Sequence, residues 1–204
     1  MGIKKRKHEY IVGIDEVGRG PLAGPITLCA VCMTPKFGRT LLRGIKDSKK
    51  LSHEKRVEWY KRLQEEKKKG NLRYTLTSVS AKSIDTIGIS RATARAIRSI
   101  LTKLDISPTV VEILLDGSLR APEEFTYQRT IIKGDEKIPI IGSASIIAKV
   151  SRDRRMTWLA KKYPGYGFEI HKGYGTALHR DAIRRLGPSE LHRKSFLTKL
   201  FPGT

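Results

Sequence analysis

The sequence predicts an α/β fold: a mixed five-stranded sheet flanked by helices, followed by a C-terminal helical cap. Short β-type runs and amphipathic helical segments alternate through the first two thirds of the chain, and the last third carries helical periodicity without a strand. Two glycine-rich stretches, near residues 18–25 and 163–175, interrupt these elements as loops.

Five segments are predicted to be strands. They cover residues 10–14, 26–33, 73–79, 110–115 and 128–132. The second and the fourth are continuous apolar runs, as expected of strands that are covered on both faces. The first is expected to end at Asp15 and Glu16, because the glycines and prolines that follow continue neither a strand nor a helix.

Helices are predicted over residues 53–69, 89–104, 140–162, 177–186 and 190–200. Ser52 caps the first of them. In the second, isoleucines and leucines recur at helical spacing while Arg91, Arg95 and Arg98 fall on the other face, which we expect to be solvated. We therefore divide the chain into a basic tail (1–9), an α/β core (10–162) and a C-terminal part (163–204) that packs on this core.

The chain is strongly basic. It holds 41 Lys and Arg residues against 20 Asp and Glu, a formal net charge of +21, and the basic residues occur through most of its length. Such a field favours a polyanionic partner, with nucleic acid the leading candidate. Ribosomal association and simple solubility are the alternatives that charge alone leaves open.

The two cysteines, Cys29 and Cys32, both lie in the apolar run 26–33. We interpret them as buried strand residues, because the four ligands of a zinc site are missing. No apolar stretch approaches the roughly 20 residues that span a bilayer, and no signal-peptide pattern follows the basic N-terminus. We expect a cytoplasmic protein without a membrane partner.

Four acidic residues stand at predicted strand ends or in short loops: Asp15, Glu16, Asp116 and Asp135. Carboxylates at the strand ends of an α/β sheet can converge. Magnesium binds to one or two carboxylates plus substrate phosphate oxygens, so four carboxylates suit two such ions. Asp116 and Asp135 each neighbour a glycine, as ordinary turn residues also do. Their occurrence with Asp15 and Glu16 in a basic chain favours a metal-dependent phosphoryl enzyme.

Six stretches of the sequence resemble the ribonuclease HII family. They are GIDEVGRGPLAGP at residues 13–25, DSKKLS at 47–52, LDG at 115–117, KGD at 133–135, SIIAKVSRD at 145–153, and YPGYGF with HKGYGT between 163 and 176. The first stretch is long enough to be very specific. The resemblance covers nearly everything from residue 10 to residue 201.

This resemblance implies a ribonuclease H-like core with a catalytic and metal-binding quartet of Asp15, Glu16, Asp116 and Asp135, using Mn²⁺ or Mg²⁺. The family cuts the RNA strand of RNA–DNA hybrids and incises 5′ of single ribonucleotides embedded in duplex DNA. Two-metal in-line hydrolysis would leave 5′-phosphate and 3′-hydroxyl ends. We expect a monomer that acts on nucleic acid.

Further residues resemble the family's substrate contacts. Gly18, Arg19 and Gly20 match the loop that reads the ribose 2′-hydroxyl, which is the group that distinguishes RNA from DNA. Tyr174 matches the tyrosine that packs against the sugar next to the scissile phosphate. Lys49, before a helix start, is expected to contact a phosphate, with a merely solvated charge as the alternative.

Other polar residues are expected to be structural. His171, His179 and His192 are interpreted as packing or surface residues, because hard cations prefer oxygen ligands. Asp153 stands between Arg152 and Arg154 in a predicted helix, where an exposed ion pair is the default interpretation.

Three alternatives belong to other classes. A non-catalytic nucleic-acid binder would need none of the four carboxylates. A ribonuclease of the HIII type normally carries a sizeable N-terminal domain, whereas nine residues precede the first predicted strand here. A junction resolvase or integrase would lack the Gly18–Gly20 loop and would not respond to a 2′-hydroxyl.

Overall fold

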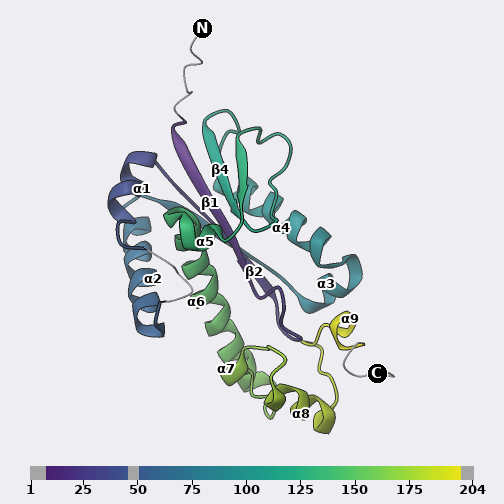
Figure 1. The fold of residues 1–204 in the computed structure, drawn as a ribbon. Coiled ribbons are helices and arrows are strands. Elements are labelled where there is room, and N and C mark those ends of the chain that lie inside the picture. Colours follow the sequence, from purple (N-terminus) through teal and green to yellow (C-terminus); the bar gives the residue numbers. More distant parts are fainter. Residues whose placement is uncertain (1–7, 46–50, 199–204) are drawn as a thin grey trace.

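A computed structural model describes residues 8–45 and 51–198, which form a twisted sheet covered by helices on both faces (Figure 1). The strands are β1 (Tyr10–Val17), β2 (Ile26–Met33), β3 (Arg73–Val79), β4 (Val111–Asp116) and β5 (Gln128–Ile131). Their order in the sheet is β3-β2-β1-β4-β5. Strand β1 pairs antiparallel with β2 and parallel with β4, so the predicted mixed five-stranded sheet is confirmed.

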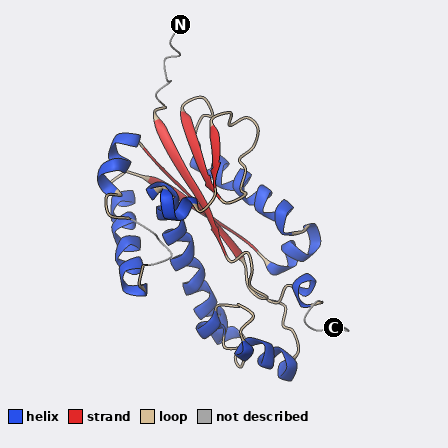
Figure 2. Cartoon of the chain, viewed as in Figure 1, coloured by secondary structure: helices blue, strands red, loops and turns tan. Residues whose placement is uncertain are grey.

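Two helical layers enclose the sheet (Figure 2). The helices are α1 (Pro35–Leu41), α2 (His53–Lys68), α3 (Ala81–Ile87), α4 (Ile89–Leu104), α5 (Gly134–Lys137), α6 (Pro139–Lys162), α7 (Phe168–His171), α8 (Ala177–Leu186) and α9 (Lys194–Leu197). Side chains alternate along a strand. On β2, Leu28 and Ala30 therefore join the core under α4, while Cys29 and Val31 join the core under α6 and α2.

The start of α6 lies directly on β1. A side-chain carbon at Gly13 would come within 2.5 Å of the carbonyl carbon and oxygen of Ile140. Only glycine allows this close approach of helix backbone to strand. The contact brings the middle of α6, including Ser145 and Lys149, alongside the end of β1.

The strands that carry the acidic residues end later than predicted: β1 ends at Val17, not at residue 14, and β4 ends at Asp116, not at residue 115. Asp15 and Glu16 lie inside β1, opposite Cys29 and Leu28 of β2, and Asp116 is the last residue of β4. Strand β1 does not stop at Asp15 and Glu16 as expected, because its ladder to β2 continues to Val17. The residue expected in a loop, Asp135, lies in the first turn of α5.

The C-terminal part also differs from the prediction. A helix over 190–200 was expected, but α9 spans only Lys194–Leu197. The residues before it form a turn, in which the N–H of His192 donates to the carbonyl of Ser189. His192 then forms a β-bridge with Ala23, and the backbone N–H of Arg193 donates to the carbonyl of Leu22. The short helices α1, α3 and α7 were not predicted. No helix within the two described ranges combines the length and apolar character needed to cross a membrane.

Three buried histidines support the loop before α8. His171 and His179 stack with ring centroids 4.2 Å apart, and His179 Nε2 lies 3.1 Å from His192 Nε2. The N–H of Ser189 donates to His192 Nδ1, so His192 donates through Nε2 to His179, which donates through Nδ1 to the carbonyl of Tyr174. All three rings are buried, which confirms their predicted packing role.

This stack should make the protein sensitive to acid. Burial, the largest cause, lowers the pKa of His179 and of His192 to about 4. Between the unfolded value of about 6.5 and this folded value, the unfolded chain binds protons that the folded chain does not, so the free energy of unfolding falls as pH falls. We expect the fall in Tm from pH 7 to pH 4.5 to shrink by several degrees in His192→Gln, measured by calorimetry.

The exposed His53 supplies the control, since His53→Gln should keep the fall of the wild-type protein. Identical acid responses of the wild type and His192→Gln would show that the stack does not contribute.

Candidate active site

An open pocket of about 350 Å³ lies where β1 and β4 end. It gathers residues from five parts of the chain. Its lining consists of residues 15–20, which are Asp15, Glu16 and Val17 of β1 with Gly18, Arg19 and Gly20 of the loop after β1, and of Arg56 of α2, Asp116 of β4, Ser145, Ile146 and Lys149 of α6, and Tyr174. The structure thus brings together seven of the nine residues singled out from the sequence.

Asp15 is the most buried acid of the pocket, at 3% exposure. The pKa of Asp15 is raised to about 8, chiefly by burial; a hydrogen bond with Ser145 opposes this rise, and the charges of Asp116 and Glu16 add to it. The backbone N–H of Glu16 also donates to Asp15 Oδ1, at 2.7 Å. A buried carboxyl group whose ionisation is disfavoured by burial and by two neighbouring charges gains from a bound cation.

The other two acids meet at the end of β4. Asp116 Oδ1 accepts hydrogen bonds from the backbone N–H groups of Gly134, at 2.6 Å, and of Asp135, at 3.4 Å. The carboxyl group of Asp135 is buried and does not line the pocket. Its backbone therefore orients Asp116 while its side chain lies outside the cavity wall.

The carboxylates suit hard divalent cations in chemistry but do not form a closed cage. Within residues 8–45 and 51–198, no three His, Cys, Asp or Glu side chains are grouped so that they could hold one ion. Magnesium usually takes only one or two protein carboxylates and completes its shell with water and phosphate oxygens. The pocket is open, so the remaining ligand positions are accessible to a substrate.

Two buried arginines hold the loop that follows β1. Arg193 donates to the carbonyl oxygens of Gly18, Arg19 and Gly24, at 2.6 to 3.1 Å. Arg152 donates to the carbonyls of Pro25 and Ala23, at 2.9 and 3.4 Å. Both side chains are completely buried. These hydrogen bonds consequently fix the carbonyl groups of the loop in one orientation.

At Gly20 the same loop is open to a ligand. Gly18 has φ +92°, and a side-chain carbon there would lie 2.1 Å from Arg152 Nε, so this position requires glycine. Nothing lies within 4 Å of the corresponding point at Gly20. Arg19 is 43% exposed at its side chain and pairs with Glu16 at 3.6 Å. A ligand can therefore approach the backbone at Gly20 closely.

Tyr174 faces the pocket and not the core. It is 41% exposed, and its ring lies 5.8 Å from the guanidinium carbon of Arg152. Its backbone is fixed, because its carbonyl accepts from His179 and its N–H donates to the carbonyl of His171. An aromatic ring on a fixed backbone at the mouth of a pocket is well placed for stacking.

Five residues of the site were missed as such in the sequence: Arg56, Ser145, Lys149, Arg152 and Arg193. Ser145 and Lys149 stand four residues apart, and this i, i+4 spacing could have identified one face of α6. No local signal marks the two arginines, because both resemble ordinary charged residues until the fold buries them.

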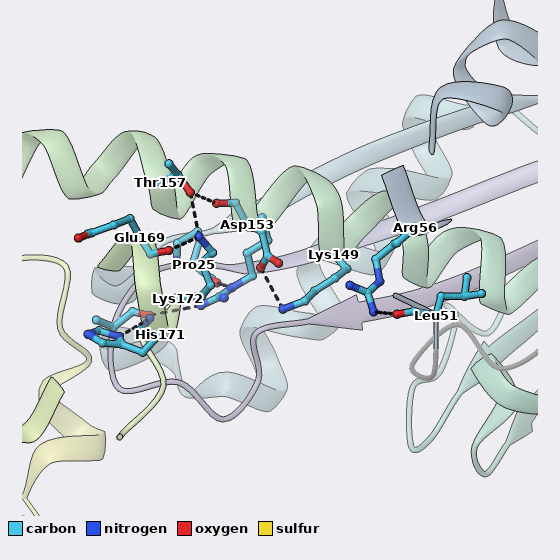
Figure 3. A network of polar contacts seen from close by, with 12 residues as sticks. Pro25, Leu51, Arg56, Lys149, Asp153, Thr157, Glu169, His171 and Lys172 are labelled. Carbon is cyan, nitrogen blue, oxygen red and sulfur yellow. Dashed lines mark hydrogen bonds and ion pairs between the residues drawn. The ribbon is translucent and has the colours of Figure 1, made fainter. Parts of the chain in front are cut away.

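Two charged residues singled out from the sequence, Asp153 and Lys49, lie outside the pocket lining or outside the described residues. The ion pair predicted at Asp153 forms with Lys149, at 3.0 Å, and is partly exposed, at 19% and 30% of the two side chains (Figure 3). The neighbouring Arg152 is buried. Lys49, expected to contact phosphate, lies outside the described residues, so its role stays a prediction.

Comparison with known proteins agrees with this arrangement. The family model described as Ribonuclease HII matches residues 12–199. The chain is 45% identical to "Ribonuclease HII" of Caldicellulosiruptor bescii, over 95% of this chain and 89% of that protein. It is 46% identical to the protein of the same name from Synechococcus, over 94% of this chain and 96% of that protein.

Solved structures are also similar. A ribonuclease H2 from Pyrococcus horikoshii superposes with a TM-score of 0.72 at 27% identity, covering 91% of this chain and 93% of that one. A ribonuclease HIII described in complex with Mn²⁺ gives a TM-score of 0.71 at 19% identity, covering 93% and 68%, and this likeness shows the fold alone.

The family match spans nearly the whole chain, and the relatives cover it at more than 40% identity. Together with the acidic pocket at the end of β1 and β4, these matches establish that the chain belongs to the ribonuclease HII family and is a ribonuclease H, an endonuclease of RNA–DNA hybrids.

Proposed function

We propose that this chain also incises duplex DNA 5′ of single embedded ribonucleotides, and that it does so by two-metal hydrolysis leaving 5′-phosphate and 3′-hydroxyl ends. The observation that carries the proposal is one pocket in which Asp15, Glu16 and Asp116 face an open glycine loop and the ring of Tyr174. The carboxylates serve the chemistry, and the loop and ring serve recognition of a ribose within a duplex.

Asp15, Glu16, Asp116 and Asp135 form the proposed set that holds Mg²⁺ or Mn²⁺. Bound there, such ions would supply an activated water and would stabilise the leaving 3′ oxygen. The raised pKa of Asp15 supports the proposal, because a carboxyl group buried beside two others needs a compensating cation to ionise at neutral pH. Asp135 joins the set from the side of Asp116, to which its N–H donates.

Recognition of the ribose is assigned to Gly18, Arg19 and Gly20. The carbonyls of Gly18 and Arg19 are already occupied by Arg193, and the backbone at Gly20 is open. A loop held in one conformation can present its backbone to the 2′-hydroxyl without first having to become ordered. Lys49 stays in the proposal as a phosphate contact.

We further propose that the protein acts as a monomer. The described residues of a single copy enclose the carboxylates, the glycine loop and Tyr174 in one pocket. Light scattering at micromolar concentration should give a mass near 23.0 kDa.

One assay tests the reaction, substrate and cofactor together. The protein is incubated with duplex DNA containing one ribonucleotide, with Mg²⁺, with Mn²⁺ or with a chelator, beside an all-DNA duplex. We expect one metal-dependent cut on the 5′ side of the ribonucleotide, with a 3′ end that a DNA polymerase extends. Cleavage of hybrids without any cut in this substrate would reject the finer specificity and leave the hybrid endonuclease in place.

Asp116→Asn should lower the cleavage rate by more than about 100-fold at saturating metal, because a ligand charge is lost. The fold should persist, since the amide oxygen can still accept from the N–H of Gly134. Removing a repelling carboxylate should leave Tm level or higher.

Glu112→Gln is the matched control for Asp116→Asn. Glu112 lies on the same strand but pairs with Arg129 outside the pocket, at 2.8 Å. It should keep normal turnover. Normal turnover in Asp116→Asn as well would remove Asp116 from the mechanism.

Tyr174→Ala should fold but cut an embedded ribonucleotide roughly tenfold more slowly or worse, because stacking on an aromatic ring contributes about 1–3 kcal/mol. Tyr174→Phe keeps the ring and should retain the stacking part of the rate. Both Tm and single-turnover rates are measured. A collapsed Tm with a normal rate for the folded fraction would assign Tyr174 to the core instead.

A further inference from the structure

A second cavity, of about 670 Å³, opens beside the active-site pocket. Its walls come from α2, from the outer side of α6 and from the residue that ends α7. Arg56 lines both cavities, so the two are neighbours along one surface. We call this second cavity the α6 groove; its charged walls are Arg56, Arg154, Lys172 and Asp153.

The α6 groove is basic. Arg56, Arg154 and Lys172 contribute positive charge, and the carboxylate of Asp153 is paired with Lys149 at 3.0 Å. In Figure 3 the labelled side chains follow α6 from Lys172 past Asp153 and Lys149 towards Arg56. The chain of polar contacts thus runs from the far end of the groove to the wall of the active site.

Lys172 has an unusual backbone. It ends α7 in the left-handed region, at φ 52°, where a residue with a side chain is strained and glycine is not. Its ammonium nevertheless donates to Thr157 Oγ1 at 2.9 Å and to the carbonyl of Glu169 at 2.6 Å. Among the described residues no carboxylate pairs with it. A strained backbone that fixes a charged side chain in a cavity points to a functional use of that side chain.

We propose that the α6 groove binds the phosphate backbone of the nucleic acid on one side of the cut, an inference that rests on the proposed function. Residues 149 and 157 lie eight positions apart on α6, a rise of roughly 12 Å. This length corresponds to about three or four base-pair steps along a duplex. In a strand that runs from the active-site pocket into the groove, the phosphates a few nucleotides from the scissile bond would therefore lie close to Arg154 and Lys172.

The test compares two double variants that each lose two positive charges. Arg154→Gln with Lys172→Gly alters the α6 groove, and Arg91→Gln with Arg95→Gln alters the exposed side of α4, on the opposite face of the sheet. Binding to an RNA–DNA hybrid is measured without metal by fluorescence anisotropy, across a range of salt concentrations. The groove variant should bind about tenfold more weakly, and the slope of log Kd against log salt should fall by about 2.

The control pair should change Kd by less than about twofold and leave the slope near that of the wild type. Since glycine relieves the strained backbone, Tm of the groove variant should be unchanged or higher. Equal effects of the two double variants, or an unchanged salt slope in the groove variant, overturn the proposal. The second result would leave the groove to another ligand, such as an acidic peptide.

Cleavage adds a readout that a structural defect would not give. On a long duplex with one ribonucleotide, the groove variant should lose more in KM than in kcat. Shortening the duplex on one flank should abolish its difference from the wild type, whereas shortening the other flank should not. A defect that persists on both shortened substrates overturns the assignment.

A last measurement uses the wild-type protein. Uncharged methylphosphonate linkages are placed one at a time along each flank of the ribonucleotide. We expect weaker binding at one run of adjacent positions on one flank, and no such run for the groove variant. Because binding is read without cleavage, failure of the groove and failure of the proposed incision remain distinguishable.

Discussion

The active site depends on two buried guanidinium groups. Arg152 and Arg193 lie without exposure below the loop after β1, and together they donate six hydrogen bonds to its carbonyls. Burial, and then the charge of Arg152, lowers the pKa of Arg193 to about 10. Buried cations without a carboxylate partner are costly unless their donors are satisfied. The loop carbonyls accept from both guanidinium groups, so a change in the conformation of the loop would leave buried donors without acceptors.

The same contacts join distant parts of the chain. Arg152 belongs to α6 and Arg193 to the segment before α9, yet both bind the residues that follow β1, 127 and up to 175 positions earlier. The acids meet a comparable constraint, because Asp15 is buried beside Asp116 and Glu16 although their charges disfavour its ionisation. A site that holds repelling carboxylates needs a rigid frame, and the arginines with the Gly13 contact to α6 supply it.

The sequence predicted what local pattern determines. The apolar run of β2, the alternating β3 and the amphipathic α4 were found with their observed bounds, because their periodicity is set by which face is buried. The ends of β1 and β4 were placed too early, since pairing with neighbouring strands decides where a strand stops. The resemblance located the pocket residues. It did not mark Arg152 and Arg193, because both stand among other charged residues in the sequence and become buried only through contacts with residues remote in sequence.

The rigid loop bears on selectivity. RNA and DNA differ at this site by one hydroxyl group, and a mobile loop could satisfy its own backbone groups whether or not that hydroxyl is present. A site built to hydrogen-bond a hydroxyl rejects the analogue without it because its polar groups are then left unpaired. That penalty requires a loop that cannot rearrange. Under the proposed function, the carbonyl bonds of Arg152 and Arg193 are therefore a source of discrimination between ribose and deoxyribose, although neither side chain lines the pocket.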